Sequence, residues 1–286
     1  MTVSATARPA RRVWQAWPHV AFNQVTLGGA VSWMVLVLLA ALLPGTVSPD
    51  DPTVLSPTRA LQPPGGVTAL GTDQYGRSIL TLLIYGARTA VTIGLCATAL
   101  ALTLGGMLGL VAGYAGRWLD MAVGRVMDVF MSFPGILLAL MITAALGRTT
   151  TNLIIAVGVA SVPAFYRLMR GQVLAVSSRL YVEAARSAGF RPSRIVFRHV
   201  LPNALAPVIV LATVEVGTSI VLGASLSFLG LGPRRDVPDW GQLLAQGQPY
   251  LDNAWWVSTL PGIALTLTVI AVSLLGDWLR DHLDAD

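Results

Sequence analysis

The side chains that could do chemistry are few and scattered in this sequence. The lone cysteine, Cys96, lies inside an apolar run without metal-ligand neighbours, so we expect a small buried hydrophobic side chain there. The three histidines, His19, His199 and His282, lie in the N-terminal tail, a polar loop and the C-terminal end, and should not converge on a metal ion. No G-x-x-x-x-G-K-[ST], H-E-x-x-H or G-x-S-x-G motif occurs. We therefore expect no catalytic residue, no metal site and no cofactor in this chain.

Charge gathers in one stretch, YVEAARSAGFRPSRIVFRHVLPN at residues 181–203, between two runs apolar enough to enter a membrane. Residues 172–188 are mostly good helix formers, and Gly189 supplies the left-handed residue that commonly ends a helix. Pro192 suits the first turn of a second helix, because its missing N–H is not needed there. The pattern predicts a rigid helix, turn and helix, which suits a mechanical contact with another protein. A merely solvated loop is the alternative that charge alone leaves open.

A single carboxylate, Glu215, interrupts the apolar run that follows. A charge at the centre of a bilayer costs about 3 kcal/mol even on lenient scales, so this side chain should not face lipid. Three hydroxyl residues lie close to the same helix face and complete a polar stripe with it: Thr218, Ser219 and Ser225. We interpret the stripe as a wall of a solute path or as a polar contact at a subunit seam. A protonated Glu215 that is hydrogen-bonded within the bundle is the alternative.

The composition indicates which elements position these residues. Hydrophobic residues make up 54% of the 286 residues and charged residues 12%, against about 25% charged in soluble domains. This balance predicts an all-α polytopic membrane protein. The net charge of +5 is carried by arginine, which favours cytoplasmic loops over nucleic-acid binding. Because a bilayer core needs about 20 apolar residues per helix, we expect six spans, at residues 27–47, 90–114, 126–147, 151–169, 203–231 and 257–279.

The distribution of arginine predicts the orientation of these spans. Most arginines fall on the side that carries residues 181–203, which favours cytoplasmic locations for that stretch and for both termini. The expected organisation is a cytoplasmic tail (1–24), a first transmembrane helix (25–47), an extracytoplasmic connection (48–89), a core of five transmembrane helices (90–280) with a cytoplasmic loop at 170–202, and a cytoplasmic end (281–286).

Small residues recur every four positions in the second expected span. Such a face lets helices approach closely in lipid, where van der Waals contact replaces the hydrophobic drive. We expect it to pack within the chain or, in part, against a second subunit. The residues are Ala97, Ala101, Gly105, Gly109 and Gly113.

The arginine-rich stretch also carries a family resemblance. Six of its residues match in type and spacing the signature of ATP-binding-cassette importer permeases: Glu183, Ala184, Ala185, Gly189, Leu201 and Pro202. Other segments resemble the C-type subunits of the dipeptide, oligopeptide and nickel permeases: LGTDQYGRSILTLLIYGAR (70–88), RVMDVFMSFPGILLAL (125–140), FRHVLPN (197–203) and SLSFLGLG with PDWG (225–232 and 238–241). The resemblance runs in order along nearly the whole chain.

This resemblance implies a type I importer permease fold in the bacterial cytoplasmic membrane. The signature residues would form a coupling helix that docks on an ATPase subunit. The implied partners are a second permease subunit in a heterodimer, cytoplasmic ATPase subunits that hold ATP and Mg²⁺, and an extracytoplasmic solute-binding protein. The implied solutes are dipeptides or oligopeptides, with nickel chelates within the range of the family.

Two other function classes remain open on the sequence. One is a secondary transporter or channel driven by an ion gradient, although neither inverted repeats nor broken midplane helices are clear in the sequence. The other is a non-transporting membrane scaffold whose cytoplasmic loop recruits a partner.

Overall fold

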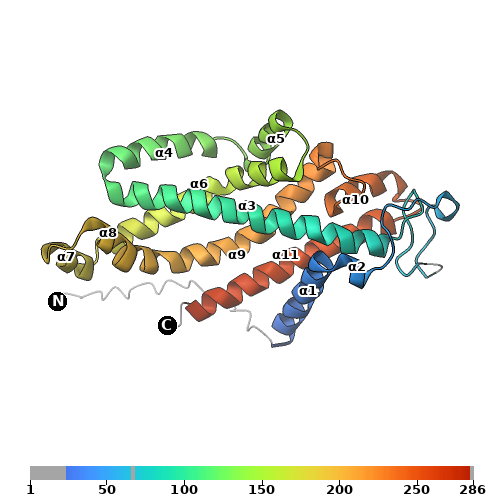
Figure 1. Cartoon of the computed structure of the whole chain (residues 1–286), viewed down its shortest axis with the longest axis horizontal. Coiled ribbons are helices and arrows are strands. Elements are labelled where there is room, and N and C mark those ends of the chain that lie inside the picture. Colours follow the sequence, from blue (N-terminus) through green and yellow to red (C-terminus); the bar gives the residue numbers. More distant parts are fainter. Residues whose placement is uncertain (1–23, 66–67, 284–286) are drawn as a thin grey trace, which may run out of the picture.

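The computed structural model describes residues 24–65 and 68–283, which form a bundle of long helices (Figure 1). The long helices are α1 (Gln24–Leu42), α3 (Ile79–Ala115), α6 (Thr150–Ser177), α9 (Leu201–Leu226) and α11 (Trp256–Leu283). The shorter helices are α2 (Pro44–Val47), α4 (Arg117–Met131), α5 (Gly135–Leu146), α7 (Leu180–Ser187), α8 (Pro192–Ile195) and α10 (Trp240–Gly247). No β-sheet forms among the described residues, and the predicted all-α fold is confirmed. The expected cytoplasmic tail, residues 1–24, lies almost entirely outside the described residues.

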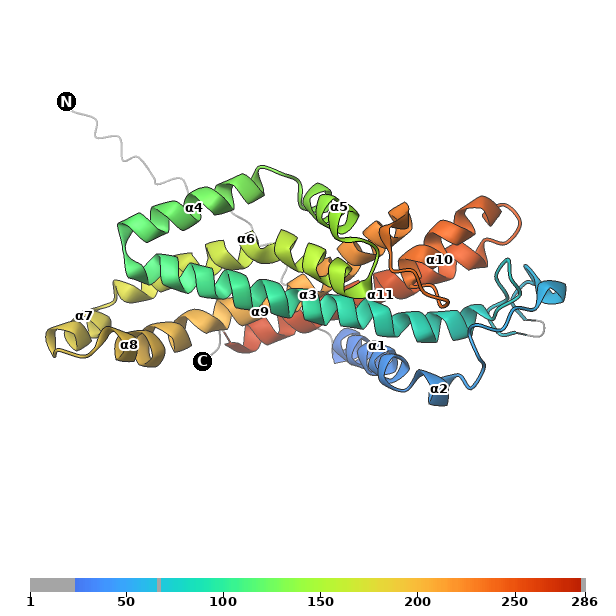
Figure 2. The same ribbon diagram turned by 45° about the horizontal axis from the view of Figure 1, so that its top comes forward.

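The two ends of the bundle differ. α7 and α8 lie at one end, while α10 and the connection that precedes α3 gather at the other (Figures 1 and 2). α3 packs against α6 and α9, and α11 packs against α9, α10 and α1. The arginine-rich stretch and the connection at 48–78 are therefore separated by the length of the bundle, as the alternating spans predicted.

Five helical segments are long and apolar enough to cross a membrane. They correspond to five of the six expected spans, although their ends differ from the predicted ones. α3 begins at Ile79 instead of residue 90 and has 37 residues. At 1.5 Å per residue it is about 55 Å long, so it extends beyond an apolar layer of about 30 Å. The fifth span is one helical run from Pro192 to Leu231, which joins α8 and α9.

The third expected span, residues 126–147, is wrong as a single straight helix. α4 and α5 meet at a break of three residues and are bent by 88°. Pro134 stands at that break; it has no N–H to donate, and it disfavours helical backbone at the residue before it. The pair counts as a sixth span only if both helices are taken together.

The small-residue face of α3 packs against α6 of the same chain. A Cβ atom at Gly105 would lie 2.5 Å from the carbonyl oxygen of Val162, and one at Gly109 would lie 2.6 Å from that of Tyr166. Ala97 and Ala101 are fully buried, and a Cβ at Gly113 would meet Val173. In the isolated chain, the small-residue face therefore packs within the chain, which is the first of the two expected alternatives.

Gly105→Ala should destabilise the bundle by about 2 kcal/mol, since backbone atoms of α6 block the added methyl group and α3 must move away. The adjacent Gly106 offers a matched control, because its Cβ would find its nearest neighbour at 3.7 Å, an ordinary contact. The thermal midpoint of the purified protein in detergent measures both effects. Equal midpoints for Gly105→Ala and Gly106→Ala would contradict the packing argument.

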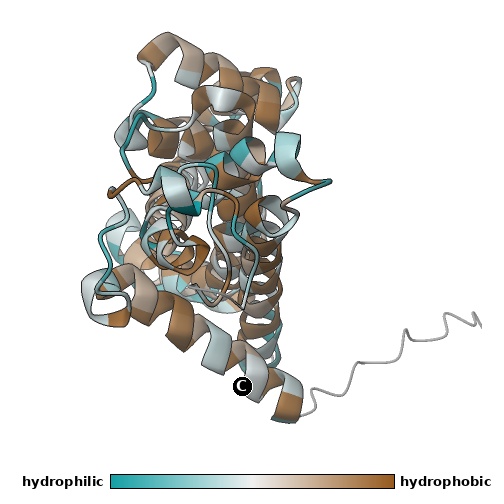
Figure 3. Ribbon diagram, turned by 90° about the vertical axis from the view of Figure 1, so that its right-hand side faces the viewer, coloured by the Kyte–Doolittle hydropathy of each residue, from teal (hydrophilic) through white to brown (hydrophobic). Residues whose placement is uncertain are grey.

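Apolar residues also cover much of the outside of the helices. In Figure 3, which looks along the bundle, hydrophobic ribbon dominates the helices and hydrophilic ribbon gathers in the connections. Exposed apolar residues such as Leu36, Met107 and Val129 meet lipid or another subunit in a membrane. Cys96 is exposed on α3, so the expectation that it is buried is wrong for the isolated chain.

Candidate functional site

A helix, a turn and a second helix are present at one end of the bundle, but the first helix does not cover the whole predicted stretch 172–188: α6 continues to Ser177, and α7 is a separate helix from Leu180 to Ser187. α7 ends with two hydrogen bonds, from the N–H of Phe190 to the carbonyl of Ala185 (3.2 Å) and from the N–H of Gly189 to that of Arg186 (3.0 Å). This pair of bonds is the Schellman motif, which needs a left-handed residue after the helix. Gly189 provides it, with φ of +76°. α8 then begins with Pro192 in its first turn.

α7 presents one buried and one open face. Val182 and Ala185 pack in a cluster with Val173 of α6 and Ile195 of α8, which anchors the helix. The opposite face carries Leu180, whose side chain is 82% exposed, and a set of further exposed residues: Tyr181, Glu183, Ala184 and Ser187. This face is therefore not covered by any described part of the chain.

The segment after α7 is continuous with the membrane helix α9. Residues 196–200 form a π-helical turn between α8 and α9, and the last residue of this turn, Val200, is fully buried. The ring of His199 lies 6.4 Å from the rings of both Tyr181 and Phe190. Leu201 and Pro202 follow this turn directly at the start of α9, within the same helical run, and Pro202 is exposed. A force on α7 would therefore reach α6 and α9 through packed side chains.

The four residues of the polar stripe on α9 differ in burial and in hydrogen-bond partners. Ser219 is buried, and its hydroxyl lies 3.3 Å from the hydroxyl of Thr98 on α3. Glu215 is partly buried and interacts with the Ser161 side chain on α6. Thr218 and Ser225 instead donate hydrogen bonds to carbonyls one turn earlier in α9. Glu215 and Ser219 thus tie α9 to its neighbours, while Thr218 stays exposed.

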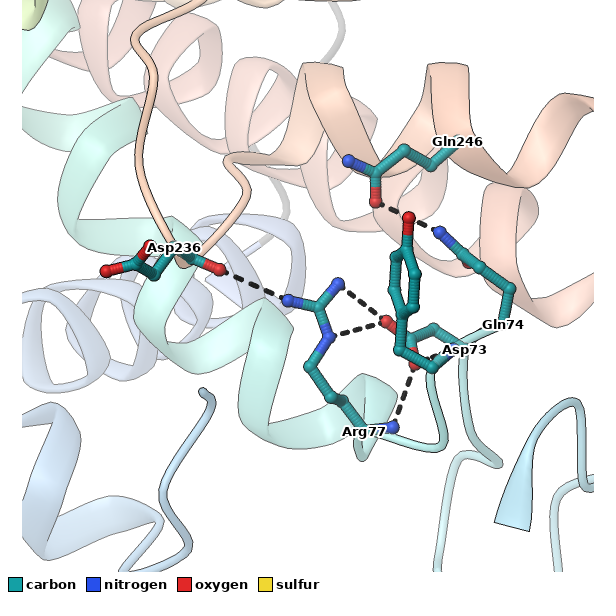
Figure 4. Close-up of polar contacts among 6 residues, drawn as sticks. Asp73, Gln74, Arg77, Asp236 and Gln246 are labelled. Atoms are coloured by element: carbon teal, nitrogen blue, oxygen red, sulfur yellow. Dashed lines mark hydrogen bonds and ion pairs between the residues drawn. The ribbon is translucent and has the colours of Figure 1, made fainter. Parts of the chain in front are cut away.

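The other end of the bundle holds a buried ion pair, which Figure 4 shows. Nε of Arg77 donates to Oδ2 of Asp73 at 2.7 Å, and these two side chains are 7% and 0% exposed. Arg77 also donates to the carbonyl oxygen of Asp236, and Gln74 donates to Gln246. These bonds fasten the segment before α3 to the loop and helix that follow α9.

Two tryptophans and an aspartate complete this junction between the segment before α3 and the loop and helix after α9. The indole N–H of Trp256 donates to the carbonyl of Thr72, and that of Trp240 donates to the carbonyl of Leu83. Asp239 caps α10 by accepting from the N–H of Gln242 and also accepts from the hydroxyl of Ser227. Burial raises the pKa of Asp239, and these bonds together with the charge of Arg235 oppose the rise. The end at which α10 lies is therefore built as a rigid platform.

Comparison with known proteins identifies the class of this architecture. Residues 105–286 match the family described as "Binding-protein-dependent transport system inner membrane component". The chain belongs to this family. It is therefore a multi-pass permease of the bacterial inner membrane, and its α7 segment and α9 lie inside the matched region.

Related permeases are similar in sequence to this chain over most of its length. The dipeptide transport system permease protein DppC of Alkalihalophilus pseudofirmus is 38% identical over 94% of this chain and 88% of its own length. The di/tripeptide transport system permease protein DppC of Pseudomonas aeruginosa is 41% identical over 96% of this chain and 92% of its own length. The glutathione transport system permease protein GsiD of Pectobacterium atrosepticum is 35% identical over 94% and 89%.

Solved structures support the fold of the permease. A chain of the MetNI methionine ABC transporter in an inward-facing conformation matches with a TM-score of 0.61 at 21% identity, over 72% of this chain and 97% of that chain. A chain of an amino acid ABC transporter matches with a TM-score of 0.59 at 16% identity, over 71% and 94%. The predicted importer-permease fold is thereby confirmed.

Two groups of charged residues in this permease were not predicted from its sequence. The Asp73–Arg77 pair lies in a segment that we treated as a connection, and its residues are not helical, so the i, i+4 rule for helices could not have indicated it. The second set lines a cleft between α4 and α6 and includes Arg125 and Asp128. Its signal was Asp128, the one charged residue inside the expected third span (126–147), with Arg125 directly before that span.

Proposed function

We propose that this permease imports short peptides as one transmembrane subunit of an ATP-driven, binding-protein-dependent complex. The observation that carries the proposal is the pair of relatives named for dipeptide and di/tripeptide transport, which share 38% and 41% identity over nearly the whole chain. Divergence at this level, with the same order of segments, usually keeps the broad class of solute. The chain would form half of the translocation path.

The proposed partners follow from the two ends of the bundle. The open face of α7, with Leu180, Glu183 and Ala184, would dock in a groove of a cytoplasmic ATPase subunit, and Gly189 would hold that face in position. A second permease subunit would complete a heterodimer, and a solute-binding protein would meet the platform near α10. ATP and Mg²⁺ would bind to the ATPase subunits, since this sequence has no phosphate-binding loop of the G-x-x-x-x-G-K-[ST] type.

The proposed orientation has α7 and both termini in the cytoplasm. Its support is the excess of arginine at the α7 end of the chain, because cytoplasmic loops of membrane proteins are enriched in basic residues. In this orientation ATP-driven movement at α7 would reach the membrane through α6 and α9, and the path would open in turn to each side.

Reconstitution of the complete complex in liposomes tests the proposed function. We expect a peptide-loaded solute-binding protein to stimulate ATP hydrolysis and labelled Ala-Ala to enter the vesicles only when ATP is present. Uptake that survives without ATP and stops when an ionophore collapses the ion gradient would instead support a secondary transporter. ATP hydrolysis that does not respond to the loaded binding protein would contradict an importer.

Glu215 supplies a test of the polar stripe. Glu215→Leu should leave the complex assembled but lower peptide uptake about tenfold, the effect of losing one interaction of about 1.4 kcal/mol. Glu215→Gln is the matched control, because the amide keeps the size of the side chain and can still hydrogen-bond to Ser161. Uptake by Glu215→Leu at the parental rate, with equal complex recovered, would remove Glu215 from the path.

A further inference from the structure

A polar cleft of about 410 Å³ opens between α4 and α6, in the half of the bundle nearer to α7. α4 starts at the α7 end and runs beside α6 toward the middle of the bundle (Figure 2). Its lining includes four arginines and two aspartates: Arg117, Arg125, Arg167, Arg170, Asp120 and Asp128.

Only some of these charged side chains have a partner within the described part of the chain. Arg170 forms a two-bond ion pair with Asp120, and Arg167 contacts the sulfur of Met131. The side chains of Arg125 and Asp128 have no hydrogen bond or ion pair among residues 24–65 and 68–283, and both are exposed and line the cleft.

A buried polar atom also faces this space. Tyr166 is 5% exposed, it lines the cleft, and its hydroxyl has no hydrogen-bond partner in the described part of the chain. A Cβ atom at Gly124 of α4 would lie 3.5 Å from that hydroxyl, so the glycine leaves room beside it. A buried hydroxyl without a partner costs free energy unless water or a solute binds it.

The positions of the acidic side chains along α4 bear on whether lipid or water fills the cleft. Asp120 and Asp128 are eight residues apart on α4, which places them about 12 Å apart along the axis of that helix. Asp128 lies inside the α4–α5 pair, which counts as a sixth span when both helices are taken together, and a charge within a span faces a water-filled cavity or a partner and marks a pathway of solutes or ions. A lipid headgroup would account for the arginines nearest to the α7 end of the cleft. It would leave the carboxylate of Asp128 in an apolar layer.

We propose that this cleft is the inner half of the solute path and that it contacts the charged groups of a passing peptide. A peptide carries a carboxylate and an ammonium group, and the cleft offers both complements: guanidinium groups form paired hydrogen bonds with carboxylates, and Asp128 attracts cations. The excess of arginine predicts that peptides with an acidic side chain pass more easily. The inference rests on the proposed import of peptides and adds where the inner path runs and which side chains line it.

Uptake of two dipeptides of opposite charge tests the proposal. Complexes reconstituted with one and the same solute-binding protein take up labelled Ala-Glu and Ala-Lys, and the ratio of the two rates is measured. Arg125→Glu should lower the Ala-Glu to Ala-Lys ratio about fivefold relative to the parent, and Asp128→Lys should raise it by a similar factor. Asp277→Asn is the control, since this exposed carboxylate lies on α11 outside the cleft and should leave the ratio unchanged.

The ratio separates a path from a structural role, because poor folding slows both dipeptides equally. Opposite shifts in the two variants support the proposal. An unchanged ratio in both variants overturns it, whether uptake is normal or reduced, and leaves peptide import itself standing. A parental complex that hydrolyses ATP but admits neither dipeptide overturns the proposed function and this inference together.

Discussion

Gly189→Val should abolish peptide uptake by the assembled importer while the transmembrane bundle stays folded. Gly189 has φ of +76°, a backbone conformation that a β-branched residue adopts only under strain. The strain costs about 2 kcal/mol, which lowers the ratio of the native turn to its alternative conformations by roughly 30-fold. Because the turn fixes the open face of α7, that loss should act on its contact with the ATPase subunit.

The surroundings of Gly189 make this a clean test of backbone conformation. A Cβ atom there would meet nothing within 4 Å, so valine causes strain without a clash. Gly189→Asn is the matched control, since asparagine enters the left-handed region more easily than other residues and keeps the turn. We expect Gly189→Asn to retain most uptake. The measurements are ATP-dependent uptake and recovery of the ATPase subunit with the tagged permease.

The two measurements separate the possible failures of Gly189→Val. Loss of the ATPase subunit on purification places the defect in docking. Normal recovery with ATP hydrolysis that no longer drives uptake places it in coupling. If Gly189→Val is recovered with its ATPase and transports at the parental rate, the turn has no coupling role.

Local rules predicted the parts of this fold that depend on a few neighbouring residues. The end of α7 at Gly189 and the start of α8 at Pro192 follow from backbone properties of glycine and proline, and the structure has both. The face of Ala97, Gly105 and Gly109 follows from helical periodicity. Its choice of α6 as the partner could not be predicted, because periodicity does not specify which helix a face meets.

Predictions failed where tertiary contacts outweigh hydropathy. The run at 126–147 has the length of a span, yet Pro134 breaks it and the charges of α4 turn toward a cleft. Ser219 and Thr218 are adjacent in sequence and looked equivalent in a stripe, but one hydroxyl is buried against Thr98 and the other is exposed. The junction between the segment before α3 and the loop and helices after α9 joins residues more than 150 positions apart, and no local pattern indicates such a contact.

Asp73→Ala should cost the permease about 4 kcal/mol of stability, the largest effect that we expect from a single substitution outside the membrane. Asp73 is fully buried, and its carboxylate accepts from the side chain of Arg77 and from the backbone N–H groups of Tyr75 and Arg77. Its removal leaves a buried guanidinium without its counter-charge. Breaking a buried pair in this way typically costs 3–5 kcal/mol, because the remaining charge is not solvated.

Matched variants separate the charge from the hydrogen bonds of Asp73. Asp73→Asn keeps an oxygen that can accept both N–H groups, so it should fall between the parent and Asp73→Ala. The double variant Asp73→Leu with Arg77→Met removes both charges and should recover much of the loss, since apolar replacement of a buried pair is often neutral. Asp51→Ala, at an exposed carboxylate of the same connection that accepts two hydrogen bonds from Thr53 and forms no ion pair, should cost much less than Asp73→Ala.

The thermal midpoint in detergent and the rate of proteolysis within residues 48–78 report on these variants. The junction holds this segment to Asp236 and Gln246, so Asp73→Ala should lower the midpoint and speed cleavage there. Because α7 lies at the opposite end of the bundle, cleavage within residues 178–192 should stay at the parental rate. Equal midpoints for Asp73→Ala and Asp51→Ala would show that the pair does not stabilise the platform. Faster cleavage at both ends would mean that the bundle unfolds as one unit and that the junction is not a separate element.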